Sequence, residues 1–418
     1  MSGSPESEDA VPGAFSAACP DTLPNVLPSA FPSERPVVVP LLAVRRLGVD
    51  SVMGRRPVGL LSDISLIVAR GEGVALLGEA GAGKSLLARV IAGLQAPGDV
   101  RVASGQMLLD GADLVEMEAA ARSRLRAGRL GVLPQGAAGL LAPDVALGQQ
   151  LGLRRVALRQ PGSGILPRLL AMLTVLGDGP AEEWLQEPVR RLPPGIAQLA
   201  LVAAALAREP ELLLADEPYD TLGRAQRLRV QQILQQHRVD RGMGLLLIAN
   251  DLSAIEFACQ RVNVMCAGEI VETGDVESIL SRPRHPYTQA LLRSAEWAKP
   301  GRFALARGAA DDQAALAEAL ARFTAAPSAQ EHLDVLPASP ATTLPFFLPG
   351  QAPVPGRWPP GCRFHPRCPI AQRELCGVSP PHLVPQGMGA DRCHLSEHAR
   401  ARDAWAEHVL VWQARSVA

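Results

Sequence analysis

The sequence predicts an α/β protein with a mainly parallel β-sheet. Short apolar runs, each long enough for a buried strand, alternate along the chain with helical patterns, and strands in such an order usually pair in parallel. One run, residues 74–77, leads directly into a glycine-rich loop and then into a helix. Aromatic residues make up only 4% of the chain while Ala and Leu dominate, which favours α/β packing over a β-sandwich.

Length and charge limit what the chain can be. With 418 residues it is too long for one ordinary core, so we expect two or more domains. The 41 basic and 42 acidic residues give a net charge of −1, and nothing there indicates binding to nucleic acid. No apolar run reaches the roughly 18 to 20 residues that a bilayer helix needs. The N-terminus has no basic residue before Arg35 and therefore does not resemble a secretory signal, so we expect a cytosolic protein that contacts the membrane only through partners.

Taken in order, the chain begins with residues 1–38, which are rich in Pro, Ser and Ala and are predicted to be disordered. Residues 140–194 are mostly helical in pattern and are broken by a loop at 161–164. The other expected helices are 86–92, 114–126, 195–208 and one ending at 260. The expected strands are 37–44, 60–68, 74–77, 106–109, 130–135, 212–214, 244–249 and a closing hairpin of 262–265 with 269–272.

The stretch from Gly73 to Gly93 organises the rest. Residues 78–85 fit the pattern G-x-x-x-x-G-K-S between a strand and a helix, so we favour a phosphate site over a glycine-rich turn with a solvated lysine. Backbone N–H groups in such a loop surround phosphate oxygens, and the helix N-terminus adds positive potential. Lys84 can reach the terminal phosphates, and the Ser85 hydroxyl can ligate Mg²⁺. The predicted binding residues are Gly78, Glu79, Ala80, Gly81, Ala82, Gly83, Lys84, Ser85 and Leu86.

A second motif complements the loop. The strand at 212–214 runs into Asp216 and Glu217, and the strand that starts at 130 ends at Gln135. Asp216 can hold Mg²⁺ through water, and Glu217, the catalytic candidate, can polarise an attacking water. The alternative, two surface acids at a strand end, is disfavoured by the phosphate loop upstream.

The order of these motifs resembles the ATP-binding subunit of an ABC transporter, over about residues 41–292 and 344–395. Residues 282–288 (Arg-Pro-Arg-His-Pro-Tyr-Thr) and 361–369 (Gly-Cys-Arg-Phe-His-Pro-Arg-Cys-Pro) are similar to blocks in the subunits of dipeptide, oligopeptide and nickel importers. The resemblance implies a P-loop ABC-type nucleotide-binding domain that adds an antiparallel β part and a helical subdomain to the parallel sheet. The implied boundaries are 39–280 for this domain, about 140–208 for its helical subdomain, and 281–418 for a C-terminal extension with an insertion at about 301–343.

The resemblance also implies the activity and the partners. The subunit would use ATP and Mg²⁺ to drive import of peptides, nickel or related small solutes, with Gln135 sensing Mg²⁺. It would sit at the cytoplasmic face of the inner membrane under two permeases, with a second ATP-binding subunit arranged head to tail. An extracytoplasmic solute-binding protein would deliver the solute.

Several positions depart from the family pattern. The family signature Leu-Ser-Gly-Gly-Gln falls on residues 192–196, where Pro193 and Pro194 remove a hydroxyl and two backbone N–H groups. Proline is tolerated in the first turn of a helix, so we expect the helix there to form. The switch histidine falls on Asn250, which cannot carry a positive charge. The aspartate of the loop after the second motif falls on Gly223, and the stretch 50–53 lacks the aromatic that would stack on adenine.

These departures leave three functional hypotheses. The chain is a transport ATPase subunit that hydrolyses adequately because Glu217 is present, or it binds ATP but hydrolyses slowly beside a competent partner subunit. In the third, it is a metal-stabilised scaffold with a vestigial nucleotide site.

Four cysteines cluster near the C-terminus, within residues 361–395, with the spacing C-x₅-C-x₇-C-x₁₆-C. In a cytosolic chain this clustering favours a metal site over disulfides, and four thiolates suit either zinc or an iron–sulfur cluster. Resemblance to the peptide-importer subunits implies a [4Fe–4S] cluster. The alternatives are zinc, for which His365, His382 and His394 are alternate ligands, and cysteines that bind no metal. Cys259 and Cys266 are expected to be buried apolar residues. The four predicted ligands are Cys362, Cys368, Cys376 and Cys393.

Overall fold

The computed structural model describes residues 40–54, 56–95, 98–152, 164–250, 252–297, 348, 350–386 and 389–395. The predicted disorder of residues 1–38 and the insertion at about 301–343 lie outside the described residues.

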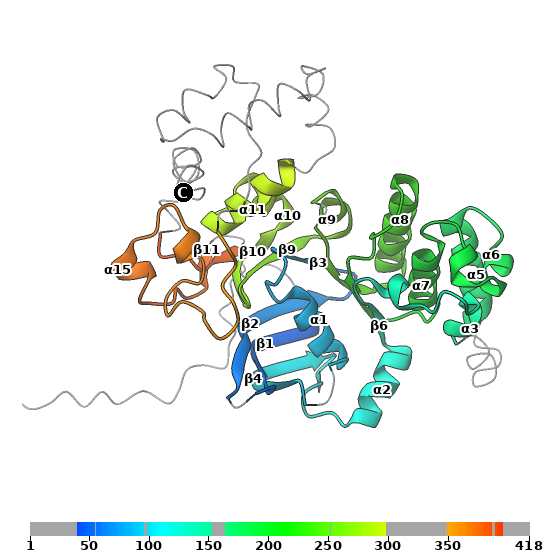
Figure 1. The fold of residues 1–418 in the computed structure, drawn as a ribbon, viewed down its shortest axis with the longest axis horizontal. Coiled ribbons are helices and arrows are strands. Elements are labelled where there is room, and N and C mark those ends of the chain that lie inside the picture. Colours follow the sequence, from blue (N-terminus) through cyan, green and yellow to red (C-terminus); the bar gives the residue numbers. More distant parts are fainter. Residues whose placement is uncertain are drawn as a thin grey trace, which may run out of the picture.

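An eight-stranded sheet forms the centre of the fold (Figure 1). Five neighbouring strands are parallel, in the order β9-β3-β8-β7-β6, and β10, β12 and β11 continue the sheet antiparallel beyond β9. The predicted mainly parallel sheet is therefore confirmed, and the predicted closing hairpin is the pair β9–β10. In chain order the strands are β3 (Gly73–Leu77), β6 (Leu130–Leu133), β7 (Leu212–Asp216), β8 (Gly244–Ile248), β9 (Arg261–Cys266), β10 (Glu269–Asp275), β11 (Val384–Gln386) and β12 (Gly389–Asp391).

A second, four-stranded sheet is antiparallel and has the order β2-β1-β4-β5. Its two longest members are longer than the sequence predicted, because their alternating apolar residues continue past the expected ends. Figure 1 draws this sheet in blue and cyan below the main sheet. Its strands are β1 (Pro40–Ser51), β2 (Val58–Ala69), β4 (Val100–Leu109) and β5 (Ala112–Asp113).

Alternate residues of the central strands serve two different cores. Leu213 and Leu245 belong to one buried cluster, whereas the next residues, Leu214 and Leu246, belong to another. The first cluster joins the main sheet to α7, α8 and α9, and the second joins it to α1 and the antiparallel sheet. Because both faces are covered, these strands read as continuous apolar runs, which is why the sequence located them well.

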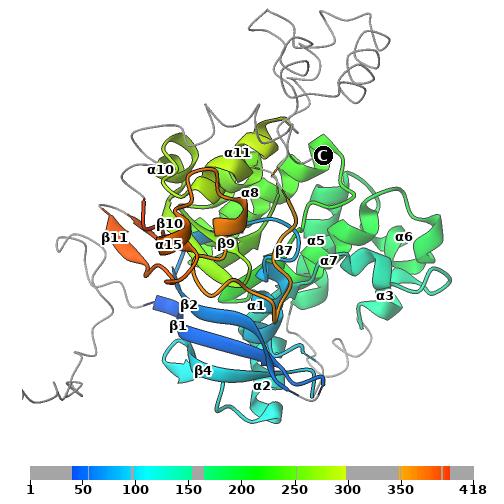
Figure 2. The same cartoon turned by 60° about the vertical axis from the view of Figure 1, so that its left-hand side comes forward.

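The helices divide between those that cover the sheet and a helical region that shares one core with the sheet (Figure 2). That region contains α3 (Leu147–Gln150), α5 (Ile165–Gly177), α6 (Ala181–Gln186) and α7 (Ile196–Leu206), with short 3₁₀ turns η1 (Ala137–Leu140) and η2 (Val189–Arg191). The others are α1 (Lys84–Ala92), α2 (Ala119–Gly128), α8 (Arg224–Arg241), α9 (Leu252–Ala258), α10 (Val276–Ser281), α11 (Pro286–Trp297), η3 (His365–Arg367) and α15 (Arg373–Cys376).

Three predicted helices differ from the structure in their starting points. The helix expected over 86–92 begins two residues earlier, at Lys84. The helix expected over 114–126 begins only at Ala119, because Leu114 is buried as part of the core beneath the antiparallel sheet. The helix expected from Gly195 begins at Ile196, so Pro193 and Pro194 precede it and do not occupy its first turn. The prolines therefore cost the helix no hydrogen bond.

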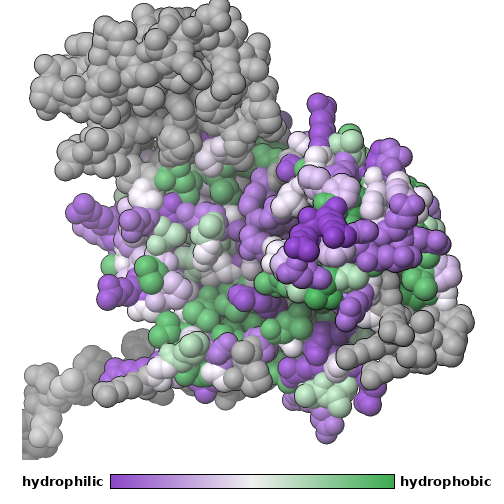
Figure 3. All heavy atoms as spheres, turned by 45° about the vertical axis from the view of Figure 1, so that its right-hand side comes forward, coloured by the Kyte–Doolittle hydropathy of each residue, from purple (hydrophilic) through white to green (hydrophobic). Residues whose placement is uncertain are grey.

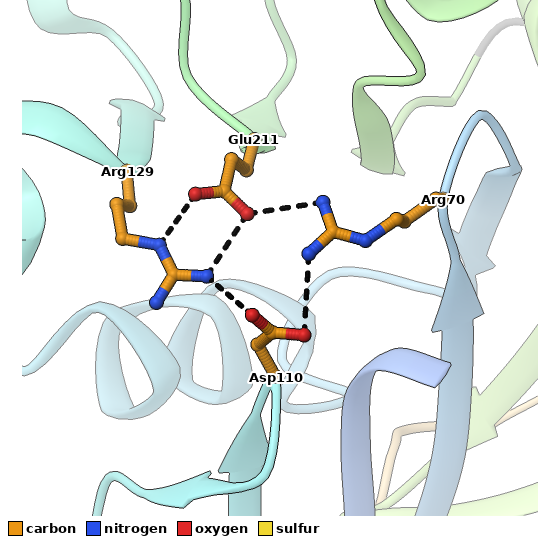
Figure 4. A network of polar contacts seen from close by, with 4 residues as sticks. All are labelled: Arg70, Asp110, Arg129 and Glu211. Carbon is orange, nitrogen blue, oxygen red and sulfur yellow. Dashed lines mark hydrogen bonds and ion pairs between the residues drawn. The ribbon is translucent and has the colours of Figure 1, made fainter. Parts of the chain in front are cut away.

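Four charged side chains join the two sheets at the end of the parallel strands opposite the phosphate loop (Figure 4). Arg129 donates to both Glu211 carboxylate oxygens, at 2.5 and 2.9 Å, and to Asp110 at 2.8 Å. Arg70 contacts the same two acids at 3.0 and 3.2 Å. The hydrogen bond from Arg129 lowers the pKa of Glu211 although partial burial opposes the shift.

The surface is mixed in character. The face drawn in Figure 3 carries hydrophilic side chains over much of its upper right part and hydrophobic ones across its middle. Within the described residues, no helix combines the length and the apolar character required to cross a bilayer.

Candidate functional site

The glycine-rich loop lies between the end of β3 and the start of α1, at the carboxyl edge of the parallel strands. Two glycines are required there for space. A Cβ on Gly78 would lie 2.3 Å from the Met265 carbonyl oxygen, and one on Gly83, which has a φ of 102°, would lie 2.7 Å from Leu61. The loop is thus held close against β9 and β2 by residues that cannot be larger.

Lys84 is the first residue of α1 and is largely buried. Its ammonium donates hydrogen bonds to the carbonyl oxygens of Gly78 at 2.6 Å and Glu79 at 2.9 Å. Burial lowers the pKa of Lys84, while the nearby carboxylates of Glu217 and Asp216 act in the opposite direction. The lysine is therefore positioned over its own loop, beside both acids that the sequence singled out.

Asp216 ends β7 next to the loop and is buried. The Ser85 hydroxyl hydrogen-bonds its carboxyl group, and burial is the main cause that raises the pKa of Asp216. Its Oδ1 has no hydrogen-bond partner among the described residues. The Ser85 hydroxyl and the Asp216 carboxylate, whose Oδ1 is unpartnered, are oxygen donors of the kind that Mg²⁺ prefers.

Glu217 follows in a left-handed conformation, with a φ of 49°, which is strained for a residue other than glycine. Its carboxylate accepts a hydrogen bond from Asn250 Nδ2 at 2.6 Å and one from Gln135 Nε2 at 3.0 Å. Three residues that the sequence predicted from separate segments thus meet at one carboxylate.

The stretch that aligns with the family signature lies beside the start of α8. Pro193 and Pro194 are exposed, and Gln226 of α8 donates to the Pro194 carbonyl at 3.4 Å. A Cβ on Gly195 would meet the Gln226 side chain at 2.7 Å. Gln226 also accepts from the backbone N–H of Gly223 at 3.1 Å, so two of the substituted segments are tied together.

The C-terminal part of the chain reaches the loop, which the sequence did not reveal. The backbone N–H of Glu79 donates to the Tyr287 hydroxyl at 2.8 Å, and the Glu79 carboxylate pairs with Arg367. Both residues belong to the two blocks that carried the resemblance to importer subunits, and that was the available signal. The two blocks indicated a family, but they did not show that these residues contact the phosphate loop.

The four clustered cysteines line one small, partly open pocket, together with His285, His365 and His394. His382, also considered as a zinc ligand, does not line it. Burial raises the pKa of Cys362 to about 11 and that of Cys393 to about 12, so these thiols need a positive group to become thiolates. Within the described part of the chain, no three His, Cys, Asp or Glu side chains are grouped closely enough to hold a single ion. Cys259 and Cys266 are buried in the core, as predicted.

Comparisons with known proteins found two matching family models. The family model described as ABC transporter matches residues 61–220, and the model of the oligopeptide/dipeptide transporter C-terminal region matches residues 271–320 and 338–376. The dipeptide transport ATP-binding protein DppD of Haemophilus influenzae is 30% identical over 85% of this chain and 95% of its own length. The oligopeptide transport ATP-binding protein AppD of Bacillus subtilis is 27% identical over 87% and 99%, respectively. A dimeric bacterial ABC transporter cassette of known structure covers 56% of this chain and 98% of its own, with 20% identity and a TM-score of 0.49.

Proposed function

The chain belongs to the ABC transporter family, among the ATP-binding subunits of oligopeptide and dipeptide import, and from this premise we propose how its residues bind and use ATP. One observation carries the proposal: Lys84 and Ser85 lie beside Asp216 and Glu217 at the carboxyl edge of the parallel sheet. Residues 78–86 hold the phosphates with backbone N–H groups, the N-terminus of α1 adds positive potential, and Lys84 turns from its loop carbonyls to the terminal phosphates.

The oxygen donors near Lys84 suit Mg²⁺. Ser85, Asp216 and Gln135 would hold the ion, which neutralises phosphate charge when bound. Glu217 then orients and polarises the attacking water. Its two hydrogen bonds, from Asn250 and Gln135, fix the direction in which the carboxylate points.

The assembly follows from the family. We propose that this subunit lies at the cytoplasmic face of the inner membrane and contacts the bilayer only through two permease subunits. A second ATP-binding subunit completes the paired ATP sites, and an extracytoplasmic solute-binding protein delivers a peptide, nickel or a related small solute. The names of the relatives favour peptides.

A second candidate concerns the rate within the same assembly. Asn250 donates to Glu217 at 2.6 Å but cannot supply the positive charge of a protonated histidine. Pro193 and Pro194 offer no N–H to the γ-phosphate of a partner's ATP. Removal of one positioned donor typically slows catalysis about 10²- to 10³-fold. These substitutions favour ATP binding with slow hydrolysis, beside a competent second subunit. Comparisons with known proteins give no support to a regulatory or purely structural role.

The four-cysteine pocket fits a four-thiolate group. Cys362, Cys368, Cys376 and Cys393 would hold a [4Fe–4S] cluster that braces the C-terminal extension, and no redox role is indicated. The resemblance to peptide-importer subunits favours the cluster, and zinc is the weaker alternative.

The nucleotide site is tested by Lys84→Ala. We expect the affinity for Mg-ATP to fall at least about 100-fold, because the buried ammonium that neutralises the terminal phosphates is lost. Equilibrium titration of purified protein with labelled ATP measures this. Arg241→Ala, at the far end of α8, is the control and should bind as wild type. Equal affinity in Lys84→Ala and wild type would refute the site.

The pocket is tested by metal analysis. Protein purified without oxygen should be brown and contain about four irons per chain, and Cys368→Ser should lose them. Cys259→Ser, in the core away from the pocket, is the control. Stoichiometric zinc without iron would replace the cluster by a zinc site.

A further inference from the structure

Glu79 is the only acidic residue of the phosphate loop, and its carboxylate is held by the C-terminal extension. Arg367 Nη1 donates to Oε1 at 2.7 Å, and Nη2 donates to Oε2 at 3.0 Å. This two-pronged geometry is the strongest that a guanidinium and a carboxylate adopt. The arginine side chain is only 4% exposed and that of Glu79 only 19%. Water therefore screens the pair weakly.

The other polar groups of Glu79 are held as well. Its N–H donates to the hydroxyl of buried Tyr287, and its carbonyl accepts from Lys84. The Tyr287 ring packs edge-on against Phe364, with ring centres 5.3 Å apart, and the Arg367 guanidinium lies 5.6 Å from the same Phe364 ring. Residues from both C-terminal blocks thus form one support beneath a single loop residue.

A carboxylate at this position is costly for a site that must accept a polyanion. Together with Asp216 and Glu217, Glu79 is the third acid whose charge acts on the Lys84 ammonium. An unpaired Glu79 would repel the phosphates and attract Lys84 away from them. Paired with Arg367, the same carboxylate adds no net charge and is fixed in one orientation.

We propose that Arg367 is a positioning residue of the nucleotide site, which neutralises Glu79 and holds the phosphate loop open for ATP. This inference rests on the proposed function, since it assumes that the loop binds ATP. Through it the C-terminal extension becomes part of the nucleotide site. Arg367 directly precedes Cys368 and follows Phe364 by one turn, and both Cys368 and Phe364 line the cysteine pocket.

The test is the rescue of one charge change by another. Arg367→Gln should weaken Mg-ATP binding on the order of tenfold, because it leaves Glu79 unpaired beside the phosphates. The double change Arg367→Gln with Glu79→Gln removes that charge and should bind within about threefold of wild type. Arg392→Gln is the matched control and should bind as wild type, because it breaks another ion pair of the same extension, between buried Arg392 and half-exposed Asp63 on β2.

The outcomes separate the possibilities. A folded Arg367→Gln variant with wild-type affinity, or a double variant as weak as the single one, would overturn the proposal, because a merely structural arginine cannot be replaced by removing its partner. If Arg367→Gln does not fold, the double variant decides alone, and affinity more than about tenfold below wild type overturns it. Wild-type protein that binds no ATP would refute the proposed function instead.

Discussion

The phosphate loop and the signature stretch are two halves of one kind of site, yet the structure treats them differently. The loop is exposed only at its tip, residues 80–81, and is held by β9, β2 and the C-terminal extension. Pro193 and Pro194, in contrast, are exposed and are tied to the rest by Gln226. A substitution in the loop would disturb several contacts within the same chain. Prolines ahead of α7 disturb none, because the helix begins after them. The contrast indicates that the fold constrains the half that binds ATP and leaves the half that faces a partner free to diverge.

The largest effect is expected for a substitution of Glu217, which lies beside the phosphate loop. Glu217→Gln should lower ATP hydrolysis by the complete transporter at least about 100-fold, because the base that polarises water is lost. ATP affinity should stay within about threefold of wild type, since the phosphates contact the loop. Steady-state phosphate release and ATP titration measure the two quantities.

Asp240→Asn is the control for that change, because this exposed acid lies at the far end of α8. It should hydrolyse ATP within about threefold of wild type. Unchanged hydrolysis in Glu217→Gln would show that another group activates water and that Glu217 is not catalytic.

A substitution of Gly195 tests whether the backbone conformation of the signature stretch is required for stability, apart from any chemical role of its residues. Its φ is 83°, and a Cβ would lie 2.7 Å from Gln226 and 3.0 Å from Leu222. Gly195→Ala should therefore lower the free energy of unfolding by about 1–2 kcal/mol. Denaturant titration measures it. Gly139→Ala, where nothing lies within 4 Å of the added Cβ, is the control and should differ little from wild type. If Gly195→Ala unfolds with the same free energy as wild type, then the fold does not require glycine at this position.

The smallest effect is expected at the charged network of Figure 4, far from both halves of the site. Because the pKa of Glu211 is lowered below 4.5, its contribution to stability is present above that pH and is lost as the pH falls through the lower value. Solvent screens these half-exposed charges, so Glu211→Gln should cost less than about 1 kcal/mol at pH 7, and the difference from wild type should shrink in acid. ATP affinity should not change. Stability curves at several pH values test this, and a difference that grows in acid would contradict it.

Much of the fold and of the site could be predicted from the sequence. The strands β3 and β8 are short and apolar. Gln135, Asp216 and Glu217 stand at or just after strand ends, and Lys84 follows the glycine-rich loop, in a recognisable order. Leu114 misled the helix prediction, since an apolar residue in a turn has the same pattern as one in a helix.

The support from the C-terminal part could not be predicted. Arg367 and Glu79 are 288 residues apart, and no local pattern encodes such a pairing. The strands β11 and β12 are equally hard to predict, because each spans only three residues. β12 pairs with the edge of β10, and β11 pairs with β12. Distant contacts of this kind are decided by the assembled fold.

The most direct test restores the family's residues in the signature stretch and at position 250. The triple change Pro193→Ser, Pro194→Gly and Asn250→His returns a hydroxyl, two backbone N–H groups and a side chain that can be charged near neutral pH. Hydrolysis is assayed with the cognate partner subunit and permeases, and ATP affinity is measured alongside. We expect the rate to rise at least about tenfold, less than the full 10²- to 10³-fold cost of each lost donor because Gly223 and the missing aromatic remain. A folded triple variant that binds ATP but hydrolyses it at the wild-type rate would show that these substitutions do not limit turnover.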